Sequence, residues 1–214
     1  ILVLYMLIRK ANVEDLDEID KIYLEGVTDE IKIQFPSRSK SDIIKEMPEY
    51  RTQAIVLDKE PVREQDAVAH LFTKSHGRVA AKLISGRKIT SKLAAHFEPN
   101  RIVTARLVEK GSVRAVDGVC IRKLNLPWGV MLAVKELAPP WEADAELYAL
   151  LSAAEQPTVT EMLAYLGYDP RFSFCLLCGK TVPEYFLVKE HEFACRECLP
   201  SFMAGGDEVI YIRE

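Results

Sequence analysis

The stretch Ala67-Val-Ala-His-Leu-Phe-Thr-Lys-Ser-His-Gly-Arg-Val-Ala-Ala-Lys-Leu-Ile84 contains two short β-like runs on either side of a turn at Gly77. Glycine is typical of the tight turns that separate neighbouring strands. Further runs of the same kind lie on both sides of this stretch, at Gln53–Leu57, Ile102–Glu109 and Ser112–Cys120, with Gly86, Pro99 and Gly111 between or beside them. About five short strands separated in this way favour a small β-barrel over a βαβ sheet.

The same part of the chain is basic. Between Lys74 and His96 there are six Lys or Arg residues and no acidic residue, namely Lys74, Arg78, Lys82, Arg87, Lys88 and Lys92. A solvated polar face is the alternative interpretation, but acidic residues are common elsewhere in the chain, and clustered basic charge is typical of nucleic-acid binding. We predict that these side chains contact phosphates, which gives affinity and salt dependence rather than sequence specificity.

The 214 residues fall into three segments of different charge. Residues 1–50 carry seven Lys/Arg against eleven Asp/Glu, residues 51–123 carry fifteen against seven, and residues 124–214 carry six against fourteen. Such differences indicate units with different neighbours. We therefore predict three units, at residues 1–46, 47–123 and 124–214.

Helical periodicity is confined to the two outer segments. Residues 6–27 have the pattern of a strand followed by an amphipathic helix. In the third segment the predicted helices are 127–137, 142–154 and 158–166, and Gly167 ends the last of them as a C-cap. The fold class predicted is multidomain α+β, with a short strand-helix segment, a β-barrel and a small helical domain.

Four of the five cysteines form two CxxC pairs, separated by sixteen residues. A CxxC turn places two sulfur atoms close enough to share a tetrahedral Zn²⁺ at about 2.3 Å, and Gly179 allows the tight turn after the first pair. We predict that one structural zinc ion is bound in a knuckle at 175–198 by Cys175, Cys178, Cys195 and Cys198. The fifth cysteine, Cys120, lies in a β-like run and is expected to be a small core residue.

Three other uses of the four cysteines are disfavoured. Two disulfides are disfavoured in a chain that shows no export signal, and iron–sulfur clusters usually follow other cysteine spacings. Catalytic zinc is disfavoured because four thiolates leave no position for water. His191 could replace one cysteine as a ligand, although nothing in the sequence requires it.

Several motifs together resemble the RecO family of bacterial recombination mediators. The first group is Tyr50-Arg-Thr-Gln-Ala-Ile-Val-Leu57, Glu64-x-Asp66, Leu71-Phe72-Thr73, Gly77-x-Val79, Gly86-Arg87-Lys88, Ser91-Lys92 and Pro99. The second group is Leu166-Gly167-Tyr168-x-Pro170 followed by the two cysteine pairs. The resemblance covers roughly residues 47–200.

This resemblance implies an OB-fold at 47–123 and a zinc-bearing C-terminal region. It implies a non-enzymatic protein of recombinational repair that binds single- and double-stranded DNA and anneals complementary strands. The partners implied are RecR, the C-terminal tail of SSB, and RecA, which the protein would help to load onto DNA.

Residues 6–20 carry a second resemblance, to the opening strand and helix of GNAT acetyltransferases. The acetyl-CoA loop of that family does not occur in the chain, so we expect 1–46 to be non-catalytic. An acetyltransferase fragment with a zinc module and a zinc-ribbon interaction module are the alternative hypotheses.

The sequence predicts no membrane segment. No apolar run approaches the roughly 20 residues that a membrane span needs. The apolar opening at 1–8 ends at Arg9 and Lys10 and lacks the features of a signal peptide. The expected location is the cytoplasm, in association with the nucleoid.

Overall fold

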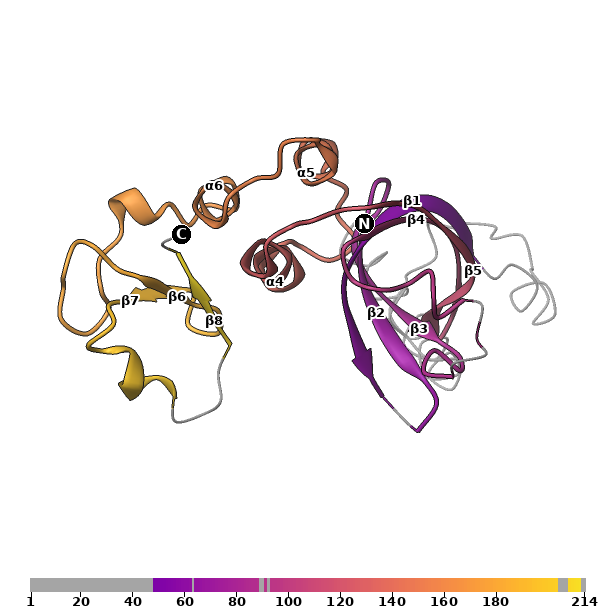
Figure 1. The fold of residues 1–214 in the computed structure, drawn as a ribbon, viewed down its shortest axis with the longest axis horizontal. Helices are drawn as coiled ribbons and strands as arrows, with labels where there is room; N and C mark the ends of the chain where they lie inside the picture. Colours follow the sequence, from indigo (N-terminus) through magenta and orange to yellow (C-terminus); the bar gives the residue numbers. More distant parts are fainter. Residues whose placement is uncertain (1–47, 63, 89–90, 92, 204–207, 213–214) are drawn as a thin grey trace, which may run out of the picture. The chain divides into compact units, whose positions relative to one another are not determined.

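A computed structural model describes residues 48–62, 64–88, 91, 93–203 and 208–212. The predicted strand and helix at 6–27 and the GNAT resemblance lie outside these residues. Within them the protein combines β-strands with short helices, as expected for a mixed α and β fold (Figure 1).

Five strands form the first part of the described chain. They are β1 (Glu49–Pro61), β2 (Ala67–Thr73), β3 (Gly77–Leu83), β4 (Arg101–Lys110) and β5 (Ser112–Lys123). Their order is β1-β2-β3-β5-β4, and β4 pairs again with β1. Neighbours are antiparallel except β3 and β5, which are parallel and meet at Lys82 and Arg114. We call these strands and their connections, residues 48–123, the β domain.

Alternation of side chains along the strands gives the β domain an apolar interior. Its fully or nearly buried members are Ala54, Val56, Ala67, Ala69, Leu71, Val79, Ala81, Leu83, Phe97, Val103, Ala105, Leu107 and Ala115. Phe97 comes from the β3–β4 connection and lies against Gly118 of β5. A Cβ atom at Gly118 would be 2.5 Å from the Phe97 ring, so a glycine at this position lets the ring pack closely against β5.

Three helices follow at the positions that the periodicity predicts. They are α4 (Trp128–Leu137), α5 (Ala145–Ser152) and α6 (Val159–Tyr165). The helix α6 has a capping box, in which Thr158 and Glu161 satisfy each other's backbone N–H groups. The helix α5 begins three residues later than predicted because the Asp144 side chain accepts from the Leu147 N–H and fixes the N-cap there.

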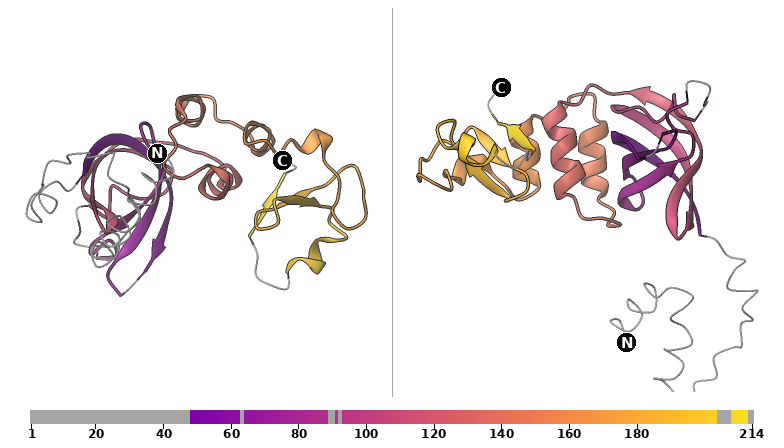
Figure 2. Two further views of the ribbon diagram at one scale, coloured as in Figure 1. Left: turned by 180° about the vertical axis from the view of Figure 1, so that it is seen from behind. Right: turned by 90° about the horizontal axis from the view of Figure 1, so that it is seen from below.

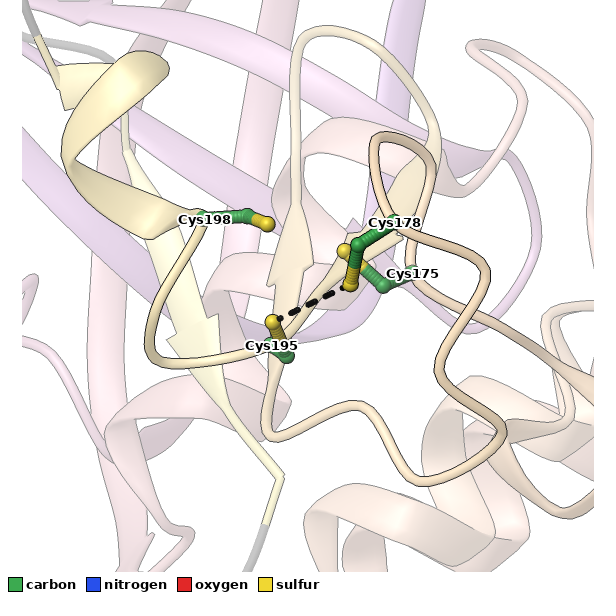
Figure 3. Close-up of side chains that lie close together, drawn as sticks. All are labelled: Cys175, Cys178, Cys195 and Cys198. Carbon is green, nitrogen blue, oxygen red and sulfur yellow. Dashed lines mark hydrogen bonds between the residues drawn. The ribbon is translucent and has the colours of Figure 1, made fainter.

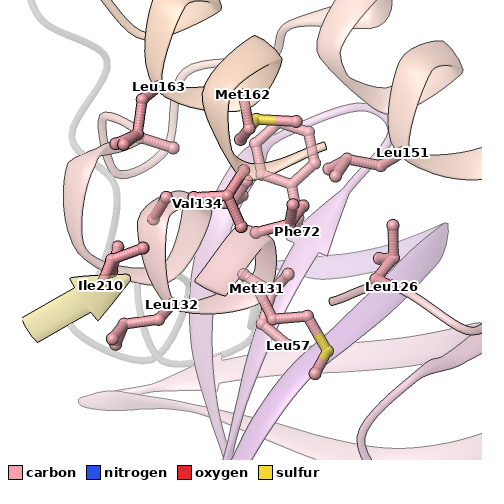
Figure 4. Packing of buried hydrophobic residues seen from close by; sticks show 14 of the residues in the cluster. Leu57, Phe72, Leu126, Met131, Leu132, Val134, Leu151, Met162, Leu163 and Ile210 are labelled. Atoms are coloured by element: carbon pink, nitrogen blue, oxygen red, sulfur yellow. The ribbon is translucent and has the colours of Figure 1, made fainter. Parts of the chain in front are cut away.

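A second apolar core joins these helices to the outer face of the β domain. Ile55 and Leu57 of β1 alternate with the interior residues and are buried among helical side chains. Phe72 of β2 packs in the same cluster as Val134 and Met162 (Figure 4). The strand β1 therefore contributes to two apolar cores, one on each of its faces, and β2 does the same with Leu71 and Phe72.

The last part of the described chain holds short elements around the cysteines. They are η2 (Pro170–Phe172), β6 (Tyr185–Leu187), β7 (Glu192–Ala194), η3 (Leu199–Ser201) and β8 (Val209–Tyr211). The strands form a sheet in the order β7-β6-β8 (Figure 1), and Figure 2 shows this part of the ribbon in yellow from two further sides. We call residues 173–203 and 208–212 the cysteine module. Among the described residues, no helix is long and apolar enough to cross a membrane.

Candidate metal centre and DNA-binding surface

The four cysteines of the two CxxC pairs come together in the cysteine module (Figure 3). Their sulfur atoms all lie within 4.8 Å of one another, and those of Cys178 and Cys195 are 3.6 Å apart. Sulfur atoms bound tetrahedrally at about 2.3 Å from a zinc ion are about 3.8 Å apart. The donor set and its spacing therefore fit a metal ion that prefers thiolates, and the cluster could hold one.

Backbone hydrogen bonds shape both cysteine turns. The Gly179 N–H donates to the carbonyl of Cys175 at 2.9 Å, and Gly179 adopts a left-handed conformation with φ of 70°. The Cys198 N–H likewise donates to the carbonyl of Cys195 at 3.2 Å. The requirement for glycine after the first pair is as predicted, because a side chain there would be strained.

The electrostatics of the cluster favour a cation. Burial opposes ionisation of Cys175, but N–H groups of Cys178, Cys195 and Leu177 donate to its sulfur and lower its pKa to about 6. Hydrogen bonding within the thiol cluster, first to Cys195, raises the pKa of Cys198 to about 12. Simultaneous ionisation of the four thiols is therefore unfavourable unless a positive ion offsets the repulsion between the thiolates.

His191 does not join the cysteine cluster. Its Nδ1 lies 2.8 Å from the hydroxyl of Tyr168, and the two rings meet edge to face. Cys120 also lies elsewhere, half-buried on β5 of the β domain. Among the described residues, the metal-binding candidates are thus the four clustered cysteines, and Cys120 is not one of them.

The predicted phosphate-binding residues do not form one cluster. Lys74 lies in the turn before β3, whereas Arg87 and Lys88 follow β3, and a strand of seven residues spans about 20 Å. Lys74, Arg87 and Lys88 are exposed. Lys92 lies outside the described residues.

Arg78 and Lys82, which lie on β3 between these two groups, are engaged within the protein. The Arg78 guanidinium donates to the carbonyl of Lys135 in α4. The Lys82 ammonium lies 3.2 Å from a carboxylate oxygen of Asp66, and both side chains are largely buried. These two residues therefore contribute contacts within the protein, and both are less exposed than Lys74, Arg87 and Lys88.

The loop with Arg87 and Lys88 is held by its backbone. The Arg87 N–H donates to the carbonyl of Gln65 at 3.0 Å, and the Ser85 N–H donates to the Asp66 carboxylate at 2.9 Å. Ser85 adopts a left-handed conformation with φ of 54°. These bonds fix the loop beside the β1–β2 turn while the side chains at 87 and 88 stay exposed.

Sequence reasoning missed an ionic cluster between β1 and α4. Lys135, only 8% exposed, lies 2.9 Å from Asp58 and 2.5 Å from Glu60. Burial opposes the charge of Lys135, but hydrogen bonds to both carboxylates raise its pKa overall. Asp58 and Glu60 alternate on the outer face of β1, a pattern that is typical of any exposed strand and gave no indication of a partner.

The fold and the two sites define a mixed α and β protein in which a basic β domain is followed by helices and a four-cysteine cluster. Residues 47–123 match the family described as "Recombination protein O N terminal". The chain is 30% identical to the DNA repair protein RecO of Cutibacterium acnes over 186 residues, which cover 72% of this chain and 76% of that protein.

Two further relatives have the same name. The chain is 30% identical over 158 residues to the DNA repair protein RecO of Myxococcus xanthus, covering 62% of this chain and 65% of that protein. For the DNA repair protein RecO of Streptomyces coelicolor the identity is 28% over 183 residues, covering 70% and 74%. The match therefore spans just under two thirds of the Myxococcus protein. The chain belongs to the RecO family of DNA repair proteins.

Proposed function

We propose that this protein is a non-enzymatic DNA-binding protein of recombinational repair. It binds single- and double-stranded DNA through the β domain, as an OB-fold, and anneals complementary strands. The observation that carries the proposal is the exposed basic loop of Arg87 and Lys88 on a β domain of the RecO family. Clustered exposed cations bind the phosphate backbone whatever the base sequence.

The charge distribution supports this assignment of DNA to the β domain. Residues 51–123 carry fifteen basic and seven acidic residues, whereas 124–214 carry six and fourteen. A polyanion is therefore attracted to the first segment and repelled by the second. The partners that we propose follow from the family: RecR and the C-terminal tail of SSB as contacts, and RecA as the protein loaded onto DNA. We place its action in the cytoplasm, at the nucleoid.

In this proposal the metal has a structural role. Cys175, Cys178, Cys195 and Cys198 would hold one zinc ion, which contributes folding free energy to a module with short strands. The four sulfur atoms would occupy the four tetrahedral positions, so no position is left for a substrate or a reactive water.

The test combines DNA binding with annealing. Metal-loaded full-length protein should shift a single-stranded oligonucleotide in a gel, and its binding constant should fall linearly with salt on logarithmic axes. It should also accelerate the pairing of two complementary strands. Salt-independent binding, or DNA binding without faster annealing, would contradict the corresponding part of the proposal.

A further inference from the structure

Three aromatic rings from distant parts of the chain meet at one end of the β domain. Tyr50 is on β1, His76 is in the β2–β3 turn, and Trp141 follows α4. The ring centroids are 4.7 Å apart for Tyr50 and His76, 5.7 Å for Tyr50 and Trp141, and 6.1 Å for His76 and Trp141. The rings meet edge to face or tilted, as aromatic clusters prefer.

The outermost ring remains open to solvent. Trp141 is 46% exposed, although it contacts both other rings. Its backbone is in the left-handed region with φ of 60°, which is unfavourable for a residue with a side chain. A tryptophan held in a strained conformation with nearly half of its surface exposed is not explained by packing alone.

Specific contacts hold Trp141 in this position. Its N–H donates to the carbonyl of Arg78 at 3.1 Å. The next residue, Glu142, lies so close to the hairpin that a Cβ atom at Gly77 would be 1.8 Å from the Glu142 carbonyl oxygen. The loop with Trp141 is therefore fitted against the β2–β3 turn, and the three rings form a preorganised surface.

Charges of both signs lie around the rings, and Lys74 is the cation in the same turn as His76. Lys74 is exposed and lies two residues before His76. The nearby carboxylate of Glu49 lies within 3.4 Å of both Arg51 and Arg106, and the carboxylate of Glu109 accepts from the Tyr50 hydroxyl at 2.9 Å. Glu49 is thus paired with two arginines, whereas Glu109 keeps its charge and Glu142, the neighbour of Trp141, is exposed. Lys74 supplies a positive charge in the same β2–β3 turn as His76.

We propose that Trp141, supported by Tyr50 and His76, is a stacking surface for a base of single-stranded DNA, with Lys74 contacting the adjoining phosphate. The proposal rests on the proposed function and names a site for it. Every base has an aromatic face, so such stacking is tolerant of sequence and requires an unpaired base. The surface therefore favours single strands, whereas the Arg87–Lys88 loop at the other end of β3 contacts either form.

The chain contains two tryptophans, which allows a direct test. Trp128, at the first turn of α4, is 59% exposed and serves as the matched control. In the Trp128→Phe variant all indole emission comes from Trp141, and titration with an oligothymidylate should quench it. In the Trp141→Phe variant, titration should leave the emission of Trp128 nearly unchanged.

Affinity gives the second measurement. Trp141→Ala should weaken binding of a labelled oligothymidylate about ten-fold, with an unchanged salt slope. Trp141→Phe should retain most of the affinity, and Lys74→Ala should lower the slope by about one. Duplex binding should change little in the tryptophan variants. Thermal melting and metal content would verify that each variant is folded.

The outcomes separate the two proposals. If the wild-type protein does not bind DNA, the proposed function fails and this site fails with it. If the wild-type protein binds but Trp141→Ala binds equally well, or Trp141 emission stays constant at saturation, only the stacking site is overturned. The exposed tryptophan would then be assigned to contact with a protein partner.

Discussion

The β domain and the cysteine module differ in what holds them together. The β domain has five strands of 7 to 13 residues around a continuous apolar interior. The cysteine module has three strands of three residues each, and two of its most buried side chains are Cys175 and Cys195. The β domain has an apolar interior of its own, whereas the module packs Phe186, Phe193 and Ile210 into the core that it shares with the helices. We expect a metal ion bound by the four cysteines to add the stability that the short strands lack. This comparison leads to four predictions, from the largest expected effect to the smallest.

The largest effect is expected from removing the metal ligands. Cys175→Ser combined with Cys195→Ser should abolish metal binding and unfold the cysteine module, since structural zinc supplies on the order of 10 kcal/mol of binding free energy. Elemental analysis should give close to one zinc per wild-type chain and none in the variant. Hydrogen exchange should show protection lost in the module and retained in β1–β5.

The matched control is Cys120→Ser, which removes a thiol outside the cluster. Its zinc content should equal that of the wild type. Cooperative loss of protection in both regions of the ligand variant would show that the β domain also depends on the metal, and the comparison would then be wrong.

The second prediction concerns a substitution that perturbs the interior of the β domain and leaves the cysteine module intact. Phe97→Ala removes a fully buried ring that packs against Gly118, and should lower the free energy of unfolding by about 3–5 kcal/mol. Zinc content should be unaffected. Phe172→Ala is the control, because that ring is 83% exposed and its loss should change stability by less than about 0.5 kcal/mol. Urea denaturation measures both.

The ionic cluster between β1 and α4 should have a smaller, pH-dependent effect. Lys135→Met leaves Asp58 and Glu60 without their shared cation and should destabilise by about 1–2 kcal/mol at neutral pH. This is less than for a fully buried pair, because the two carboxylate side chains are 39% and 47% exposed. Lys59→Met, which frees the single carboxylate of Glu98, is the control and should cost less.

The sign of the pH dependence follows from the carboxylates. Burial raises the pKa of Asp58 but the hydrogen bond from Lys135 lowers it overall, and the Lys135 hydrogen bond is the main cause of the lowered pKa of Glu60. The two ionised carboxylates thus contribute fully to the free energy of unfolding above their ordinary pKa values of 3.8 and 4.5. This contribution is lost as the pH falls through their lower pKa values in the folded state. The difference between wild type and Lys135→Met should therefore shrink as the pH falls below 3.8. A constant difference would show that the cost comes from packing.

The smallest effect concerns DNA binding. Arg87→Ala with Lys88→Ala should weaken binding for all sequences and reduce the salt slope by about two, without altering stability. The charge-matched control is Lys180→Ala with Arg196→Ala in the cysteine module, where both cations pair with glutamates. The control should leave the slope unchanged. Equal losses in the two double variants would remove the distinction between the regions.

Much of the local structure was predictable because it depends on neighbouring residues. Each of the five predicted β-like runs forms a strand. The C-cap of α6 is Leu166 rather than Gly167, which follows it in the left-handed conformation with φ of 92° and so occupies the C′ position that favours glycine. The spacing of a CxxC turn brings the two thiols of each pair together. The two pairs themselves meet through a longer-range contact, the bridge between Cys175 and Phe193.

Contacts between distant residues were not predictable in this way. The hydrogen bond from the Arg78 guanidinium to the Lys135 carbonyl of α4 is one of them, because the position of α4 depends on packing. The meeting of Tyr50, His76 and Trp141 depends on the same packing. The sequence predicts six basic residues from Lys74 to Lys92 as phosphate contacts but gives no distance between them, and β3 separates Lys74 from Arg87. The length of β3 sets the distance between the turn with Lys74 and the loop with Arg87.

The double role of β1 and β2 has a consequence for the preparation of fragments. A fragment ending at Lys123 keeps the interior of the β domain but loses α4 and α6. Ile55, Leu57, Phe72 and Ile102, which are buried against those helices, would then face water as one apolar surface. Such a fragment is expected to self-associate. A soluble fragment should therefore carry polar substitutions at these four positions, because one that ends after α6 would instead expose the helix faces that pack against Phe186 and Ile210.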